Sequence, residues 1–138
     1  MQAKEVMSSN IRIIPSNTSI QAAAGLMRDM DVGILPVTED GEIVGMLSDR
    51  DIAIRAVAEG ADPTATPARE IMSREVISCY ADQDAREVVN VMEQKKVRRV
   101  VVVDRNNEAI GLISVDDLAL HPEIRPLAER VIQQASRH

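Results

Sequence analysis

Aromatic side chains are almost absent from this sequence, which holds one tyrosine, Tyr80, and no tryptophan or phenylalanine among 138 residues. This shortage argues against a platform that stacks the bases of single-stranded nucleic acid. A flat ring bound here must instead be held by aliphatic side chains. Cysteine is equally scarce, because Cys79 is the only one. An internal disulfide is therefore excluded, and we expect a cytoplasmic protein in a reducing environment.

Long apolar runs and an excess of positive charge are also missing. No apolar run reaches the length of a membrane-spanning helix, and residues 1–5 lack the apolar stretch of a secretory signal. The net charge of −6 argues against nucleic acid and anionic membranes as partners. What is present is a 45% share of hydrophobic residues, in a length typical of one domain, which is enough for a packed core.

The chain repeats itself after about 65 residues. Met7-Ser8 recurs as Met72-Ser73, and residues 45–52 recur as 111–118. The second copy has one extra residue in a turn, a change that a repeat of structural units tolerates. We therefore expect two copies of one arrangement rather than a single continuous domain.

Each half is predicted to follow the order β-α-β-β-α. The expected strands are residues 11–14, 34–37 and 43–47 in the first half, and 76–79, 100–103 and 109–113 in the second. The expected helices follow Ser19, Ser48, Asp84 and Ser114, which are candidate N-caps. Those after Ser19 and Asp84 run to about Met30 and Lys95.

The predicted fold class is α/β (α+β). We expect two repeats, residues 1–60 and 68–121, a turn-rich linker at 61–67 and a C-terminal helix at 122–138. Because a half of about 60 residues is marginal on its own, the repeats are expected to pack through their sheets into one module with pseudo-twofold symmetry.

The motif Gly-apolar-apolar-Ser-x-x-Asp occurs at residues 45–51 and again at 111–117. Together with Ile-Leu-Pro-Val at 34–37 and the two Met-Ser pairs, it resembles a tandem pair of CBS domains, the Bateman module. Residues 45–63 are similar to stand-alone bacterial CBS pairs of the hypoxic-response kind. The resemblance implies a regulatory module that binds AMP, ADP, ATP or S-adenosylmethionine in clefts between the halves. It implies no obligatory cofactor, and a nucleotide with or without Mg²⁺.

The resemblance also implies roles for particular residues. Asp51 and Asp117 would bind the ribose hydroxyls, with Ser48 and Ser114 beside the ribose and phosphate. The adenine would lie against strand residues, and the phosphates would meet local cations. The strand candidates are Ile13, Ile14, Leu35, Pro36, Ser78, Cys79, Val100 and Val101, and the cation candidates are Arg50, Arg55 and Arg99.

These residue types suit both the ligand role and a simpler structural one. A carboxylate accepts from two vicinal hydroxyls, and a serine at a helix start lies where free N–H groups attract an anion. Ser-x-x-Asp is equally the pattern of a capping box, and the two roles can coexist. Because Asp116 stands where the first copy has Arg50, we expect the two sites to differ, the first being better suited to a charged nucleotide.

No catalytic constellation is visible, because a Walker loop, a dinucleotide-binding glycine motif and Cys/His metal spacing are all missing. His121 and His138 lie near the end of the chain and form no catalytic set. We therefore expect a sensor that signals to a separate effector protein, or a ligand-free structural or interaction module, rather than an enzyme. Either would form a homodimer through apolar helix residues, namely Met27, Met30, Ile52, Ile54 and Val57.

Overall fold

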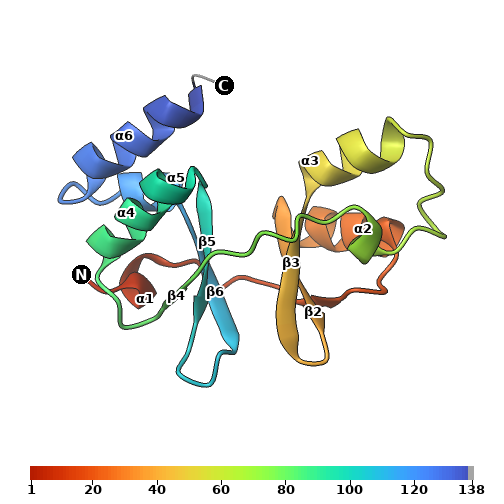
Figure 1. Ribbon diagram of the computed structural model, residues 1–138, viewed down its shortest axis with the longest axis horizontal. Helices are drawn as coiled ribbons and strands as arrows, with labels where there is room; N and C mark the ends of the chain where they lie inside the picture. Colours follow the sequence, from red (N-terminus) through yellow and green to blue (C-terminus); the bar gives the residue numbers. More distant parts are fainter. Residues whose placement is uncertain (137–138) are drawn as a thin grey trace. The chain divides into compact units, whose positions relative to one another are not determined.

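The computed structural model describes residues 1–136, and residues 137–138, with His138 among them, lie outside the described part. The chain folds into two compact units (Figure 1). We call Arg12–Val76 the middle unit. The terminal unit combines Met1–Ile11 with the chain from Ile77 onward.

The middle unit is built on a three-stranded sheet in the order β1-β2-β3. Its elements are β1 (Ile14–Pro15), α2 (Ile20–Met30), β2 (Ile34–Glu39), β3 (Glu42–Ser48), α3 (Asp49–Asp51), the π-helix η1 (Ile52–Val57) and the 3-10 turn η2 (Ala68–Glu70). β1 runs parallel to β2, and β2 runs antiparallel to β3. The helix α3 continues directly into η1, so one helical segment follows β3.

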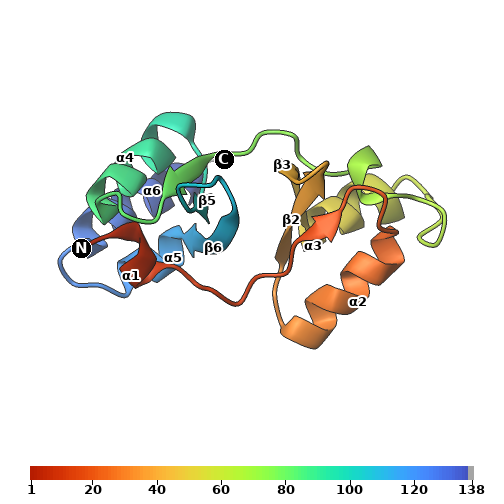
Figure 2. The ribbon, with the colours of Figure 1, turned by 90° about the horizontal axis from the view of Figure 1, so that it is seen from below.

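The terminal unit has the same sheet pattern, in the order β4-β5-β6. Its elements are α1 (Ala3–Val6), β4 (Ser78–Tyr80), α4 (Ala85–Lys95), β5 (Arg99–Val103), β6 (Ala109–Ser114), α5 (Val115–Ala119) and α6 (Arg125–Ser136). The added helix α6 packs against α4 and α5 (Figure 1). The N-terminal helix α1 belongs to this unit and lies against α4 and β6 (Figure 2).

The long helix of each unit begins and ends as its sequence predicts. Ser19 caps α2, and its Oγ accepts from the Ala22 N–H at 3.1 Å. Asp84 caps α4 by accepting from the Arg86 N–H at 2.9 Å. Both helices end in a residue with left-handed backbone, which stops further helical hydrogen bonding. The predicted α/β fold with repeated β-α-β-β-α order is thus confirmed.

Each unit has its own hydrophobic core between its sheet and its helices. In the middle unit Leu35 and Leu47 are fully buried beside Met27. In the terminal unit Val100 and Ile113 pack with Met92. Alternate residues of β2 and β5 enter these cores, because successive side chains of a strand point to opposite faces.

Several element bounds differ from the prediction for reasons of tertiary pairing. β1 begins at Ile14, the residue opposite Val37 of β2, and no ladder partner is available for residues 11–13. The turn-rich stretch 61–67 is bound to α2, since the Pro63 and Thr66 carbonyls accept from the Gln21 and Ile20 N–H groups. The C-terminal helix begins at Arg125 rather than at residue 122. Within residues 1–136 no helix is both long and apolar enough to cross a bilayer.

Candidate functional site

The first Ser-x-x-Asp motif forms a reciprocal cap at the start of α3. Ser48 ends β3, and its Oγ accepts from the Asp51 N–H at 3.0 Å. The Asp51 carboxylate reaches back, and its Oδ2 accepts from the Ser48 N–H at 2.9 Å. These bonds satisfy two of the backbone donors that the start of a helix leaves open. The capping role is therefore present in this motif.

The second motif repeats this geometry at the start of α5. Ser114 Oγ accepts from the Asp117 N–H and Asp117 Oδ2 accepts from the Ser114 N–H, both at 3.0 Å. In both motifs the box uses Oδ2 alone. Since an ionised carboxylate offers about four lone-pair sites, each half-buried aspartate keeps acceptor capacity on Oδ1. Capping therefore leaves each carboxylate able to bind a further donor.

The glycine that opens the first motif lets another backbone segment approach β3. A Cβ on Gly45 would lie 2.5 Å from Met72 Sδ and 2.8 Å from the Ser73 carbonyl oxygen. Ser73 and Met46 exchange two backbone hydrogen bonds of 2.9 Å at this point. Gly45 is thus required by the close contact between β3 and the Met72-Ser73 pair.

The terminal unit contains the same close contact. A Cβ on Gly111 would lie 2.5 Å from Met7 Sδ and 2.9 Å from the Ser8 carbonyl oxygen. Ser8 and Leu112 exchange hydrogen bonds of 2.8 and 3.0 Å. The recurring Met-Ser pairs are therefore edge segments that lie against the motif strand of their unit.

Arg55 is the cation that the structure brings closest to the first motif. Its Nε lies 3.8 Å from Asp51 Oδ1, one helical turn away. Its Nη1 lies 3.4 Å from the carbonyl oxygens of both Ile71 and Met72. The side chain is about half exposed. Arg55 therefore joins the motif carboxylate to the segment that packs on Gly45.

The other cation candidates are placed differently. The Arg50 side chain is exposed and makes no hydrogen bond or ion pair within residues 1–136. Arg99 begins β5, exposed and directly opposite Ser114 of the second motif. Its neighbour Arg98, just before β5, lies 3.9 Å from Asp116 Oδ1, so the cations near the second motif lie at the start of β5 rather than on the following helix.

Some of the candidate adenine-binding residues lie in the core of their unit, and others lie on the face of the sheet opposite that core. Ile14 and Leu35 are buried in the core of the middle unit, at 2% and 0% exposure. Pro36 lies between two core-facing residues of β2, so its side chain points to the other face, and Ile13 is half-buried just before β1. Val101, which stands at the repeat position of Pro36, occupies the corresponding face of β5.

Two further candidates from the second repeat also lie in the core. Cys79 and Val100 are buried there, while Ser78 is exposed. Burial raises the pKa of the Cys79 thiol to about 11, which keeps it protonated at neutral pH. Pro36 and Val101, on the opposite sheet faces, are also buried, so Ile13 and Ser78 are the candidates with at least partly exposed side chains.

Sequence reasoning did not identify the Ile71 and Met72 carbonyls as partners of Arg55. Backbone carbonyls carry no residue signature, and these lie 16 and 17 positions along the chain. The recurring Met-Ser pair was the available signal that this segment has a defined place. The structure therefore adds a backbone partner to the predicted set of side chains.

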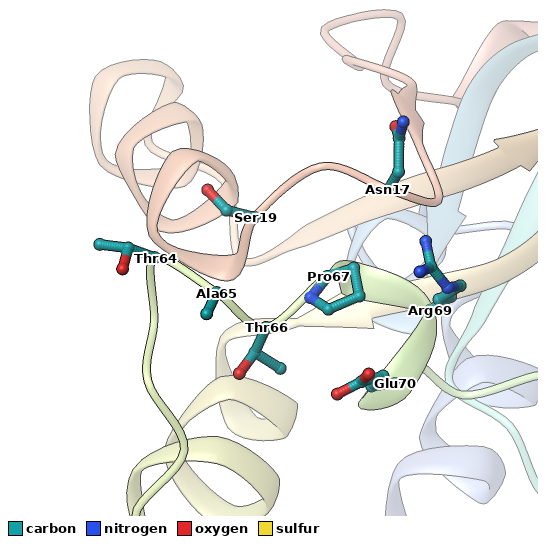
Figure 3. A pocket seen from close by; sticks show the side chains of 8 residues that line it. All are labelled: Asn17, Ser19, Thr64, Ala65, Thr66, Pro67, Arg69 and Glu70. Carbon is teal, nitrogen blue, oxygen red and sulfur yellow. The ribbon is translucent and has the colours of Figure 1, made fainter.

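A separate pocket of about 300 Å³ lies in the middle unit. Figure 3 shows the side chains that line it. Its lining residues are Asn17, Ser19, Thr64, Ala65, Thr66, Pro67, Arg69 and Glu70. Ser48 lies opposite Ile34 at the start of β2, whereas the Ser16 N–H beside the pocket donates to Thr38 near the end of β2. The pocket contains none of the predicted binding residues. Among residues 1–136, no group of three or more His, Cys, Asp or Glu side chains is placed to hold a metal ion.

Two relatives cover most of the chain. The "CBS domain-containing protein YhcV" of Bacillus subtilis is 39% identical over 118 residues, covering 86% of this chain and 83% of that protein. "Hypoxic response protein 1" of Mycobacterium tuberculosis is 34% identical over 120 residues, with the same coverages of 86% and 83%. The similarity to the hypoxic-response proteins predicted from the motif is thus confirmed.

Two solved structures with bound adenosyl compounds share the fold. A CBS domain protein of Pyrobaculum aerophilum complexed with AMP has a TM-score of 0.80 and 26% identity, covering 94% of this chain and 99% of that one. The CBS domain pair of protein MJ0100, in complex with 5-methylthioadenosine and S-adenosyl-L-methionine, has a TM-score of 0.75 and 27% identity, covering 87% and 98%. The CBS domain family itself matches residues 3–57 and 68–122. This chain therefore belongs to the CBS domain family and carries two CBS domains in tandem.

Proposed function

We propose that this CBS pair is a regulatory module that binds an adenosyl ligand, such as AMP, ADP or ATP, and signals its presence to a separate effector protein. The observation that carries this proposal is that the capping boxes use only Oδ2 of Asp51 and Asp117, so that Oδ1 accepts no hydrogen bond from any described residue at the helix start of either unit. Such a carboxylate suits a ribose, because the two vicinal hydroxyls of the ribose can both donate to it.

The surroundings of Asp51 suit an adenylate better than those of Asp117. Arg55 supplies a half-exposed cation one turn from the carboxylate, which a phosphate group needs. Ile13, half-buried just before β1, offers an aliphatic side chain for the adenine. Asp117, in contrast, has the exposed carboxylate of Asp116 beside it. We therefore assign the phosphorylated ligand to the first motif.

The relatives support this ligand class. AMP is bound to the Pyrobaculum aerophilum protein, and 5-methylthioadenosine and S-adenosyl-L-methionine to the pair of MJ0100. All three compounds share the adenosyl group, the part that the motif carboxylate would recognise. We further propose that the protein is a regulator and not an enzyme, and that it acts in the cytoplasm, where a lone buried cysteine stays reduced.

A second candidate is a structural or interaction module that binds no nucleotide. The capping boxes favour it, because they account for both motifs without a ligand. In either case we propose a homodimer formed through the helices. The exposed apolar side chains Ile54, Val57 and Leu120, at 50%, 72% and 74% exposure, support such a contact surface.

Calorimetric titration with AMP, ADP, ATP and S-adenosylmethionine tests the ligand role. We expect Asp51→Asn to weaken AMP binding by at least about tenfold, since the amide replaces an acceptor by donors. The control is Asp49→Asn, an exposed neighbour outside the box. Asp117→Asn reports on the second motif. Absence of binding to the wild type at millimolar nucleotide would favour the structural module, and binding unaffected by both motif changes would show that the site lies elsewhere.

A further inference from the structure

The Arg55 guanidinium lies between the Ser-x-x-Asp motif of the middle unit and the segment at the end of that unit. On one side it lies near Asp51, which belongs to the motif, and on the other near the Ile71 and Met72 carbonyls. No other cationic side chain within residues 1–136 contacts these carbonyls. Arg55 is therefore the charged link between the proposed ligand site and the segment 71–73.

This segment is the last anchored part of the middle unit before the chain leaves it. Ile71 and Met72 are each 5% exposed, and Ser73 is paired with Met46 of β3. The following residues have no strand or helix, and the middle unit ends at Val76, after which the chain enters the terminal unit (Figure 1). A change in how firmly this segment is held would therefore reach the connection to the other unit.

The contacts of Arg55 are long. The distances of 3.4 Å to the carbonyls and 3.8 Å to Asp51 exceed the 2.7–3.2 Å range typical of N–H···O bonds. A phosphate group accepts from a guanidinium at shorter distance and through two parallel bonds. A phosphate beside Asp51 would consequently compete well for Arg55.

The helix that carries Arg55 also has a geometry that allows the side chain to leave its present contacts. Arg55 lies in η1, where the Ala58 N–H donates to the Ala53 carbonyl five residues earlier. Such π-helical turns are less regular than an α-helix and are frequent at functional sites. Arg55 is thus carried by a segment that is not fixed in the tighter α-helical register.

The terminal unit lacks an equivalent link. His121 stands at the repeat position of Arg55, and Val6-Met7 at that of Ile71-Met72. Within the described chain, no cationic side chain hydrogen-bonds to the Val6 or Met7 carbonyl. Among the described residues, an arginine that joins the motif to the following segment is therefore found at the first motif and not at the second.

We propose that Arg55 detects the phosphate of an adenosyl phosphate bound at the first motif and, on binding it, releases the Ile71 and Met72 carbonyls. The loss of these bonds loosens segment 71–76 and so transmits the bound state toward the terminal unit. The proposal rests on the proposed function, because it needs an adenosyl ligand at Asp51. Adenosine, which has no phosphate, would bind without releasing the segment.

The test combines calorimetry with amide hydrogen exchange on the full chain. AMP and adenosine are titrated into the wild type, Arg55→Gln, Arg55→Lys and the control Arg28→Gln. The control removes the same charge from an exposed position on α2. Exchange is followed over residues 71–76, above all at the Ser73 N–H that donates to Met46.

We expect the wild type and Arg28→Gln to bind AMP about tenfold more tightly than adenosine. Arg55→Gln should lose this preference while adenosine affinity stays the same, and Arg55→Lys should retain part of it. AMP, but not adenosine, should speed exchange at Ser73 in the wild type. Arg55→Gln should show faster exchange there without any ligand.

Different failures point to different errors. If neither compound binds the wild type, the proposed function is wrong. If both bind and Arg55→Gln keeps the AMP preference, the phosphate-detecting role of Arg55 is wrong while the proposed function stands. If AMP leaves exchange at Ser73 unchanged, the release of the segment is overturned.

Discussion

At the scale of single residues, Gly45 and Gly111 show why the two motifs begin as they do. Each lies under a Met-Ser pair, with a sulfur and a carbonyl oxygen where a Cβ would project. A methionine side chain can move, but a backbone oxygen held by a hydrogen bond cannot do so without breaking the pairing. The glycine is therefore a packing requirement of the edge segment and needs no ligand to explain it.

We predict that Gly45→Ala and Gly111→Ala each lower the free energy of unfolding by about 2 kcal/mol, through overpacking against this carbonyl. Chemical denaturation measures the change. The control is Gly25→Ala in α2, where the nearest atom to a new Cβ is 3.9 Å away. That variant should be stabilised by up to about 1 kcal/mol because alanine favours helix. Equal stability of all three variants would contradict the close contact.

At the scale of elements, the helix starts could be predicted because their signals are local. Ser19, Ser48, Asp84 and Ser114 all cap the helices that the sequence assigned to them. Such caps depend on residues two or three positions apart, so their spacing is visible in the sequence.

We predict that Ser48→Ala and Ser114→Ala each reduce the free energy of unfolding by about 1 kcal/mol, the usual cost of losing an N-cap. Urea denaturation of each variant supplies the measurement. Ser9→Ala serves as control, since Ser9 is exposed and its hydroxyl makes no hydrogen bond within the described residues. If Ser9→Ala lowered the free energy of unfolding as much as the two cap variants do, the loss of the capping boxes would not explain the destabilisation.

The parts of the site that the sequence could not predict depend on distant contacts. Alternation along β2 decides that Leu35 enters the core while Pro36, also buried, lies on the opposite face of the sheet, yet a run of four apolar residues at 34–37 does not reveal which face is which. The partners of Arg55 are backbone atoms, whose position follows only from the fold. Arg55 itself could be singled out because it lies one turn from Asp51 on the same helix.

At the scale of the whole molecule, the apolar residues proposed for dimer contact behave differently from one another. Met27 is buried in the core of the middle unit, and Ile52 packs against it. Ile54 and Val57 remain exposed on η1, and Leu120 is exposed just after α5. Met30 is half-buried at the end of α2 and belongs to neither core, so it stays a candidate beside these three exposed side chains, whereas the buried Met27 does not.

We predict that the wild type sediments as a dimer at micromolar concentration and that Ile54→Glu combined with Val57→Glu shifts it to monomer. A charge buried in an apolar contact would cost several kcal/mol of association free energy. Gln21→Glu, which adds charge at an exposed position of α2, should remain dimeric. The variant Leu120→Glu shows whether the terminal unit contributes to the dimer interface. A wild type that is monomeric under these conditions would remove the dimer.

The terminal unit is assembled from both ends of the chain, because Met7 and Ser8 pack on β6. During synthesis the first eleven residues leave the ribosome long before their partner strands exist. The middle unit, whose segments are contiguous, can complete its core while the rest is still being translated. Since Ser8 pairs with Leu112 of β6, the N-terminal segment has no partner until β6 has been synthesised, and we expect the terminal unit to complete its core after the middle unit.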